Sequence, residues 1–279
     1  MPIHLDSTDV LYLRSLLAEA RQAWPSEWQA WYLRGIQEPL GLMCLERAQY
    51  LSSAMPQHMP LVQVAQGWVW HADNFTAGER SQVLQGISQA LKGKGQITGW
   101  RNETYACWGW IDSAWPYTRP ELFRLERAAF RYFGLRSHAA HVHGLMPDAR
   151  MWCGRRALHK STDPGLLDNL AAGGLPAGEQ PMQCAVREVF EEAGLEQCMN
   201  DFLPQTSEVL TERKVAEGWH SERLFVYNLQ MTQDQRPNNL DGEVSEFLCL
   251  SLTEVIQRMK ANEFTPDAAF AIAKTFLQD

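Results

Sequence analysis

Apolar residues in the first half of the chain recur with helical spacing in some segments and form short unbroken runs in others. Asp6 and Ser7 are typical of a helix start, and the leucines, Ala20 and Trp24 that follow are spaced for one buried helical face. Gly134 is typical of a helix end. The pattern predicts helices at residues 8–35, 76–91 and 123–133, and strands at 41–45, 61–64 and 68–70.

The second half alternates short strands with helices. We therefore place a domain junction near residues 134–138, between an N-terminal α+β domain (1–135) and a C-terminal domain (136–279). The expected C-terminal fold is α/β, a mixed sheet between helices. Here the pattern predicts strands at 151–153, 208–211 and 224–227, an edge strand at 241–248, and helices at 252–260 and 266–277.

One further helix carries three carboxylates on a single face. Glu188, Glu191 and Glu192 stand at positions i, i+3 and i+4, between Pro181 in the first turn and Gly194 as a left-handed stop. Like charges at this spacing repel by roughly 0.2–0.5 kcal/mol per pair, so a divalent cation with oxygen ligands would stabilise them. A solvated, Glu-rich helix face is the alternative. The predicted apolar stripe consists of Ala185, Val186, Val189 and Phe190.

Composition narrows the function classes. The chain has 279 residues, 45% hydrophobic and 21% charged, with a formal charge of −8, which argues against nucleic acid or an anionic membrane as the main partner. No apolar run is long enough to cross a bilayer, and the first residues do not resemble a signal peptide, so we expect a cytoplasmic protein. The six cysteines form no Cys-x-x-Cys pair and are expected to be reduced core residues.

The carboxylate helix belongs to a longer pattern. Written out, it is Gly173, five residues, Glu179, seven residues, Arg187-Glu188, an apolar residue, any residue, Glu191-Glu192, any residue, Gly194 and Leu195. This pattern resembles the Nudix box at every defining position. The resemblance implies a Nudix α/β/α sandwich and Mg²⁺- or Mn²⁺-dependent hydrolysis of a diphosphate, with small molecules as substrates.

The resemblance extends beyond the box to one Nudix subfamily with its own N-terminal domain, similar to the Nudix part found beside thiamine pyrophosphokinase in some fungi. It implies hydrolysis of thiamine diphosphate, or of its oxidised forms, to the monophosphate and phosphate. The matching segments are residues 99–103 with Tyr105, 126–129 with 133–134, 141–142, 155–156 with Lys160, 164–165 and 168–169, and later 241–244 and 263–266.

Metal and catalytic roles follow from the helix and the box. Glu188, Glu191 and Glu192 are the expected metal ligands, and the resemblance adds a carbonyl near Gly174. Arg187 lies four residues before Glu191 and is expected to fix a carboxylate. Two candidates for the general base remain open, Glu188 itself and a downstream carboxylate. The downstream candidates are Glu243 and Glu246.

Basic residues just before the box are candidates for holding substrate phosphates. They are Arg155, Arg156 and Lys160, and Arg101 is a fourth candidate, within an aromatic strand. A buried ion pair between Arg101 and Glu103 at the domain interface explains these two residues nearly as well. Structural roles are also expected for the eleven tryptophans, and for His141 and His143, which lack further zinc ligands at a suitable spacing.

Two positions depart from the subfamily pattern, and two alternative functions stay open while a third is disfavoured. His143 stands where asparagine is usual and Thr265 where lysine is usual, so the preferred substrate could differ. A nucleotide-type Nudix pyrophosphatase would share the same catalytic face, and a regulator would bind a metabolite without catalysis. An isopentenyl diphosphate isomerase is disfavoured, because alanines occupy 171 and 172 where it needs a cysteine. The N-terminal domain could shape the pocket, cover a sheet edge or form a homodimer interface.

Overall fold

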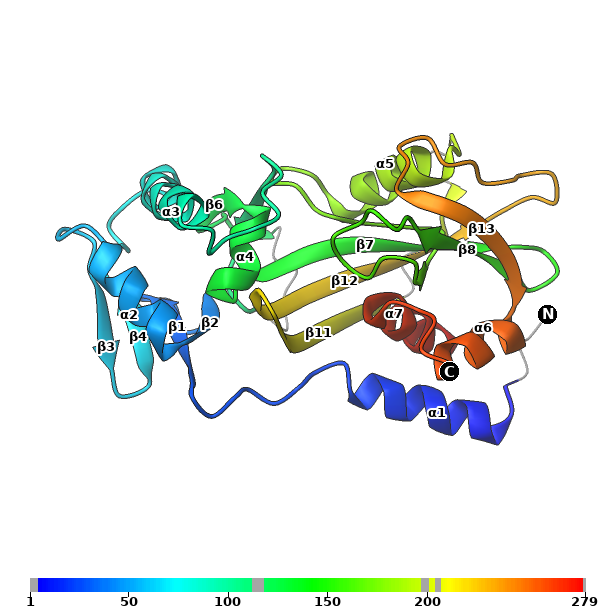
Figure 1. The fold of residues 1–279 in the computed structure, drawn as a ribbon, viewed down its shortest axis with the longest axis horizontal. Coiled ribbons are helices and arrows are strands. Elements are labelled where there is room, and N and C mark those ends of the chain that lie inside the picture. Colours follow the sequence, from blue (N-terminus) through cyan, green and yellow to red (C-terminus); the bar gives the residue numbers. More distant parts are fainter. Residues whose placement is uncertain (1–4, 112–117, 197–200, 204–206, 278–279) are drawn as a thin grey trace.

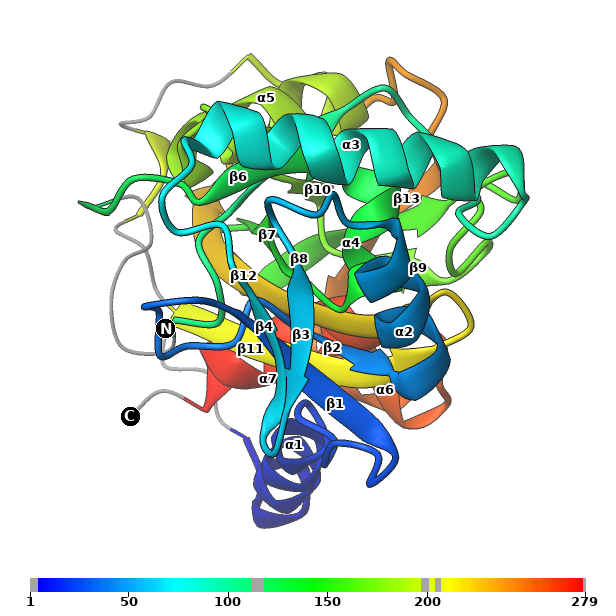
Figure 2. The same ribbon diagram turned by 90° about the vertical axis from the view of Figure 1, so that its left-hand side faces the viewer.

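The computed structural model describes residues 5–111, 118–196, 201–203 and 207–277. It has two parts that lie side by side along the long axis of the molecule, a smaller α+β part and a part built on a long mixed sheet (Figures 1 and 2). The predicted fold class, a mixed α/β sheet between helices with an α+β region before it, is confirmed. Among the described residues, no helix is both long and apolar enough to cross a membrane.

A four-stranded sheet of order β2-β1-β4-β3 organises the smaller part. Its core is aromatic, with Trp31, Trp70, Phe123 and Phe133 in mutual contact. A separate antiparallel pair, β5–β6, leads into α4, and β5 contacts the first strand of the second part. The elements are β1 (Trp28–Leu33), β2 (Gly41–Cys44), α2 (Leu45–Ala54), β3 (Leu61–Val64), β4 (Gly67–Trp70), α3 (Ala77–Gly93), β5 (Thr104–Cys107), β6 (Phe123–Glu126) and α4 (Arg127–Phe133).

The larger part is a seven-stranded mixed sheet of order β11-β12-β7-β8-β13, in which β10 also pairs with β7 and β9 with β8. Strand β13 is an edge strand, as predicted from its sequence. The elements are β7 (Arg136–Leu145), β8 (Arg150–Arg156), β9 (Leu167–Asp168), β10 (Ala171–Gly174), α5 (Pro181–Ala193), β11 (Ser207–Val215), β12 (Gly218–Gln230), β13 (Val244–Ser251), α6 (Leu252–Lys260) and α7 (Pro266–Phe276).

Helices cover both faces of this sheet (Figure 1). Because side chains of a strand alternate between its faces, Ala140 of β7 packs with Val189 of α5, whereas the neighbouring Ala139 packs with Ala271 of α7. The stripe of α5 is narrower than predicted, since Phe190 is 45% exposed. The buried face of α5 therefore includes Glu188 and Glu192 beside its apolar residues, whereas Glu191 is half-buried.

The N-terminal helix α1 (Ser7–Ala18) packs on α7, below the large sheet in Figure 1, although the chain then runs to the smaller part. Leu13 is completely buried there, in a cluster with residues of α6 and α7. The domain boundary at residue 135 stays a prediction. Helix α1 belongs to the predicted N-terminal domain by its place in the sequence, but it packs against the C-terminal part.

Two predicted helices are wrong in part. The helix at 8–35 ends at Ala18, and strand β1 begins at Trp28, because Pro25 cannot continue a helix and the residues after it are rich in aromatic side chains. The helix at 123–133 starts only at Arg127. Before it, Phe123 and Leu125 are buried while Arg124 is exposed, an alternation that belongs to strand β6.

The described cysteines are free, in agreement with the prediction that they are reduced. Cys107, Cys153 and Cys184 are buried core residues, while Cys44 and Cys249 are half-buried. Cys198 lies outside the described residues. Burial raises the pKa of the Cys184 thiol, so this cysteine is a weak nucleophile despite its place in the box helix.

Candidate active site

One cavity of about 320 Å³ lies between the box helix, the end of β10 and the loop after β8. It is lined almost entirely by polar and charged side chains, and both parts of the chain contribute to its wall. Most of the predicted site residues meet here: Gly174, Arg187, Glu188, Glu191, Arg156, Lys160 and Glu243. The structure thus brings together residues that are up to 87 positions apart in the sequence, from Arg156 to Glu243.

Glu188 and Glu192 are the two buried carboxylates of the box helix. Glu188 lies directly against the backbone of Gly173, and burial raises the pKa of this carboxyl to about 7. Glu192 accepts a hydrogen bond of 2.9 Å from the amide of Ala172, and burial followed by the charge of Glu188 raises its pKa well above the usual value. A buried carboxylate with a raised pKa is a group that a bound cation would stabilise.

The guanidinium of Arg187 organises the outer side of the same face. It donates to both oxygens of Glu179 at 2.9 Å, to Glu188 at 2.7 Å and to Glu191 at 2.9 Å. These hydrogen bonds, led by those to Glu179, raise the pKa of Arg187, so it stays charged. The sequence-based expectation that Arg187 fixes a carboxylate therefore agrees with the geometry.

The downstream carboxylates differ in position. Glu243 lines the cavity and forms an ion pair with Lys160. Burial alone would raise the pKa of Glu243, but the ammonium of Lys160 lowers it below the usual value. Glu246 is not among the cavity residues and is paired with Arg155. Of these two candidates for a general base, only Glu243 lines the cavity.

The predicted phosphate-binding residues are only partly brought together. Arg156 and Lys160 line the cavity, and Arg101 lines a second pocket that shares these two residues with it. Arg155 is not at either pocket; it donates to the carbonyl of Gly165 and to Glu246. Neighbouring residues of a strand point to opposite sides, so Arg155 and Arg156 of β8 cannot both face the cavity. Arg101 has no ion pair with Glu103, which pairs with Arg127 instead.

The donor atoms fit a hard divalent cation. Glu192, Asp241 and Glu243 each place a carboxylate oxygen within 4.8 Å of the others, and Glu188 and the Gly173–Gly174 backbone line the adjoining wall. All are oxygen donors, the ligands that Mg²⁺ and Mn²⁺ prefer. Asp241 was not among the predicted ligands.

Several cavity residues were not expected from the sequence. From the smaller part come Tyr105, Arg127 and Arg131, and from the sheet and α7 come Glu222 and Asp267. Glu103, a polar candidate beside Arg101 in the sequence, also lines the cavity. Tyr105 lies in a segment that resembles the Nudix subfamily, but no property of the residue alone indicated its role. Arg127 and Arg131 are four positions apart on α4, so they share a helix face, a spacing that the sequence did offer.

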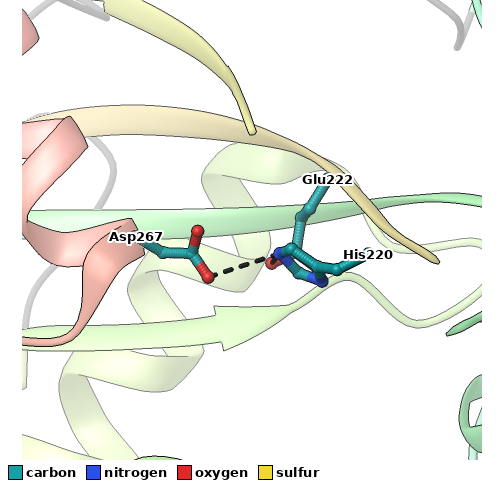
Figure 3. A group of neighbouring side chains, drawn as sticks. All are labelled: His220, Glu222 and Asp267. Atoms are coloured by element: carbon teal, nitrogen blue, oxygen red, sulfur yellow. Dashed lines mark ion pairs between the residues drawn. The ribbon is translucent and has the colours of Figure 1, made fainter. Parts of the chain in front are cut away.

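A second cluster of possible metal ligands lies at the opposite wall, where α7 begins (Figure 3). His220 Nε2 is 3.4 Å from Asp267 Oδ2 and 3.9 Å from Glu222 Oε2. Both oxygens of Asp267, however, already accept hydrogen bonds from Arg213, at 2.7 and 2.8 Å. The guanidinium of Arg213 thus occupies both carboxylate oxygens that Asp267 could offer to a cation, so we interpret the cluster as a buried ion-pair network.

The histidines of β7 have protein partners. His141 Nδ1 is 2.8 Å from Asn169 Oδ1, and His143 Nε2 is 3.2 Å from the Thr275 hydroxyl. His143 is completely buried away from the cavity, so its departure from the subfamily pattern does not touch the site. Thr265 does line the cavity, and it also caps α7 by accepting a hydrogen bond from the amide of Ala268.

Comparison with known proteins agrees with this geometry. Residues 136–270 match the NUDIX domain, and residues 54–137 match a domain of unknown function, DUF4743. The part built on the seven-stranded sheet is thus similar to a Nudix domain over residues 136–270. The DUF4743 match ends where the sheet of the Nudix domain begins, and it includes the β5–β6 pair and α4 that reach the cavity.

Two curated relatives carry Nudix names, both from Arabidopsis thaliana. "Nudix hydrolase 24, chloroplastic" is 35% identical over 71% of this chain and 54% of the relative, and "Nudix hydrolase 20, chloroplastic" is 33% identical over 67% and 49%. The chain thus spans about half the length of these relatives. The MutT protein from Methanosarcina mazei Go1 is a similar solved structure, 17% identical, with a TM-score of 0.42 over 50% of this chain and 92% of that one. The predicted link to thiamine pyrophosphokinase stays a prediction.

Proposed function

We propose that this protein is a divalent-metal-dependent diphosphate hydrolase whose active site is the cavity at the box helix. The observation that carries the proposal is that Glu188 and Glu243 line one polar cavity and that an oxygen of the buried Glu192 lies within 4.8 Å of those of Glu243 and Asp241. Glu192 is buried and forms no ion pair with a described Lys or Arg side chain, and such a carboxylate costs stability unless a cation compensates it, which favours a metal-dependent enzyme over a regulator that only binds a metabolite.

Each group has a defined part in the proposed reaction. Glu188, Glu191, Glu192 and the carbonyl of Gly174 would hold the divalent ion, which when bound neutralises phosphate oxygens and assists ionisation of water. Arg156 lies in the cavity wall, 3.2 Å from Asp168, and can orient the diphosphate. The carboxylate of Glu243 is ionised at neutral pH and accepts a proton from the attacking water. The bond from the terminal phosphorus to the bridging oxygen breaks, and inorganic phosphate and the monophosphate leave.

Thiamine diphosphate, or one of its oxidised forms, is the substrate we propose. The segments that resemble the thiamine-related subfamily are the ones that form the cavity: Glu103 and Tyr105 from the first, Arg156 and Lys160 from the second. The cavity also mixes acidic and basic groups, which suits a ligand with an anionic diphosphate and a cationic ring. This support is independent of the box, which would serve any diphosphate.

A phosphate-release screen tests the proposal. The full chain is incubated with Mg²⁺ or Mn²⁺ and thiamine diphosphate, its oxidised forms, ADP-ribose or nucleoside triphosphates. We expect the highest kcat/KM with a thiamine compound, and loss of turnover in Glu188→Gln but not in Glu196→Gln, whose side chain is exposed after the box helix. Preference for ADP-ribose or a nucleotide would show that the proposed substrate, a thiamine compound, is wrong. Binding without phosphate release would overturn the enzymatic proposal.

A further inference from the structure

The antiparallel pair β5–β6 of the DUF4743 region is joined directly to the glycine-rich loop of the Nudix domain. The amide of Ala177, just before the box helix, donates a 2.8 Å hydrogen bond to the carbonyl of Thr104 on β5. The next residue, Tyr105, places its hydroxyl against the α-carbon of Gly174, so closely that any side chain at 174 would overlap it. Gly174 is the predicted source of a metal-binding carbonyl.

The Tyr105 side chain is held firmly. The residue is 5% exposed, its ring makes an edge contact with Phe130 at 5.5 Å, and the Arg127 guanidinium lies 5.6 Å from the ring centroid. Arg127 is in turn fixed by a 2.7 Å hydrogen bond to Glu103. A ring held in this way delivers its hydroxyl to one position with little loss of conformational entropy on binding.

The hydroxyl has no hydrogen-bond partner among the residues that the structure describes, although the residue is only 5% exposed and lines the cavity. A hydroxyl that opens into the cavity without a protein partner is free to donate to a ligand or to solvent at this position. A phenol is protonated at neutral pH, so the Tyr105 hydroxyl can donate. Beside a cation-binding carbonyl, the acceptor with the matching charge is an anionic phosphate oxygen.

We propose that the Tyr105 hydroxyl donates a hydrogen bond to a phosphate oxygen of the diphosphate bound at the box helix. The DUF4743 region then supplies a substrate-binding residue to the Nudix active site, in addition to covering the sheet. This inference rests on the proposed function for the identity of the ligand as a diphosphate. It does not depend on which group the diphosphate carries.

Tyr105→Phe is the direct test, since it removes the hydroxyl and keeps the ring. Hydrogen bonds to charged groups correspond to roughly a 10- to 100-fold change in affinity, and we expect a loss of this size in kcat/KM with the preferred substrate. Tyr132→Phe is the matched control: its hydroxyl donates to Gln96 at 3.0 Å within the smaller part, away from the cavity. This control is expected to keep the wild-type kcat/KM.

A binding measurement separates this inference from the proposed function. Isothermal titration of the full chain with methylenediphosphonate and Mg²⁺ gives a Kd without turnover, and Tyr105→Phe should raise it by about 10-fold or more. If the wild type binds this probe but hydrolyses no diphosphate, the proposed function fails while the Kd ratio still decides on Tyr105. If Tyr105→Phe matches the wild type in both Kd and kcat/KM, or only lowers the melting temperature, the hydroxyl has a structural role and the inference is overturned.

Discussion

The carboxylate of Glu188 occupies the space that a side chain at position 173 would need. Gly173 lies in strand β10 and is not one of the glycines with a positive φ, so its backbone conformation is open to any residue. Glycine is required at this position for room and not for conformation. The nearest atoms belong to the far end of a flexible side chain, which can move aside.

Gly173→Ala should therefore reduce activity without unfolding the protein. The new methyl group displaces the Glu188 carboxylate from the cavity wall, and a misplacement of about 1 Å at a reacting centre costs on the order of 100-fold in rate. The melting temperature should change little, because the displaced carboxylate can turn toward solvent. Phosphate release and thermal unfolding of the same preparation check both parts.

Gly86→Ala is the control for this substitution. Gly86 lies inside α3 with nothing near its α-carbon, and alanine there should stabilise the helix by about 1 kcal/mol with unchanged activity. If Gly173→Ala kept full turnover, Glu188 would not need its observed position. If Gly173→Ala unfolded the protein, glycine would be required for the packing of strand β10 and not for the position of the Glu188 carboxylate.

The sequence predicted the box side of the site well, because its parts are local. Glu188, Glu191 and Arg187 belong to one helix, and helical spacing alone places them on one face. The helix end at Gly194, in the left-handed conformation, follows from the same local rules. The wrong prediction that Arg155 lines the site also has a local cause. Side chains alternate along β8, so Arg155 and Arg156 point to opposite faces of the sheet.

The opposite wall of the cavity could not be predicted in the same way. Tyr105 and Arg127 reach the box only because β5 docks on the glycine-rich loop, a contact between residues 104 and 177. Glu222 arrives through the parallel pairing of β12 with β7, where it lies opposite Ser137. Such long-range pairings depend on the whole fold, so composition and periodicity carry no signal for them.

Glu192→Gln tests two effects of the buried carboxylate separately: its free-energy cost in the metal-free protein and its contribution to metal binding. Burial raises the pKa of Glu192, so without metal the charged form destabilises the fold, and glutamine can still accept from the Ala172 amide. We expect the metal-free variant to melt at or above the wild-type temperature. Mg²⁺ at about 100 times its Kd should raise the wild-type melting temperature by roughly 5 °C, and the variant clearly less.

Calorimetric scans in chelator and in Mg²⁺ measure both effects of Glu192→Gln. Glu196→Gln, with an exposed side chain outside the helix, should retain the wild-type response to Mg²⁺. A variant at 192 that responded to Mg²⁺ like the wild type would remove Glu192 from the ligand set.

Leu13→Ala tests the docking of α1 on α7. Leu13 is completely buried in the cluster with α6 and α7, and removing such a side chain costs about 2–5 kcal/mol. We expect a melting temperature lower by roughly 5–15 °C. Leu11→Ala, on the same helix but 66% exposed, should melt like the wild type. Equal melting of the two variants would mean that α1 contributes no stability to the Nudix domain.

His143 should make the fold sensitive to acid. Burial, with a smaller contribution from the charge of His141, lowers the pKa of His143 to about 3, whereas in the unfolded chain it is near 6.5. The unfolded state therefore binds an extra proton as the pH falls below about 6.5, and the free energy of unfolding decreases by about 2 kcal/mol by pH 5.

His143→Asn, which introduces the residue usual in the subfamily, removes this proton uptake. The loss of stability between pH 7.5 and pH 5, measured by urea unfolding, should be smaller by that amount in the variant, whatever its stability at pH 7.5. His58→Asn, an exposed histidine, should keep the wild-type dependence, and an unchanged pH dependence in His143→Asn would show that the buried imidazole takes up its proton without unfolding.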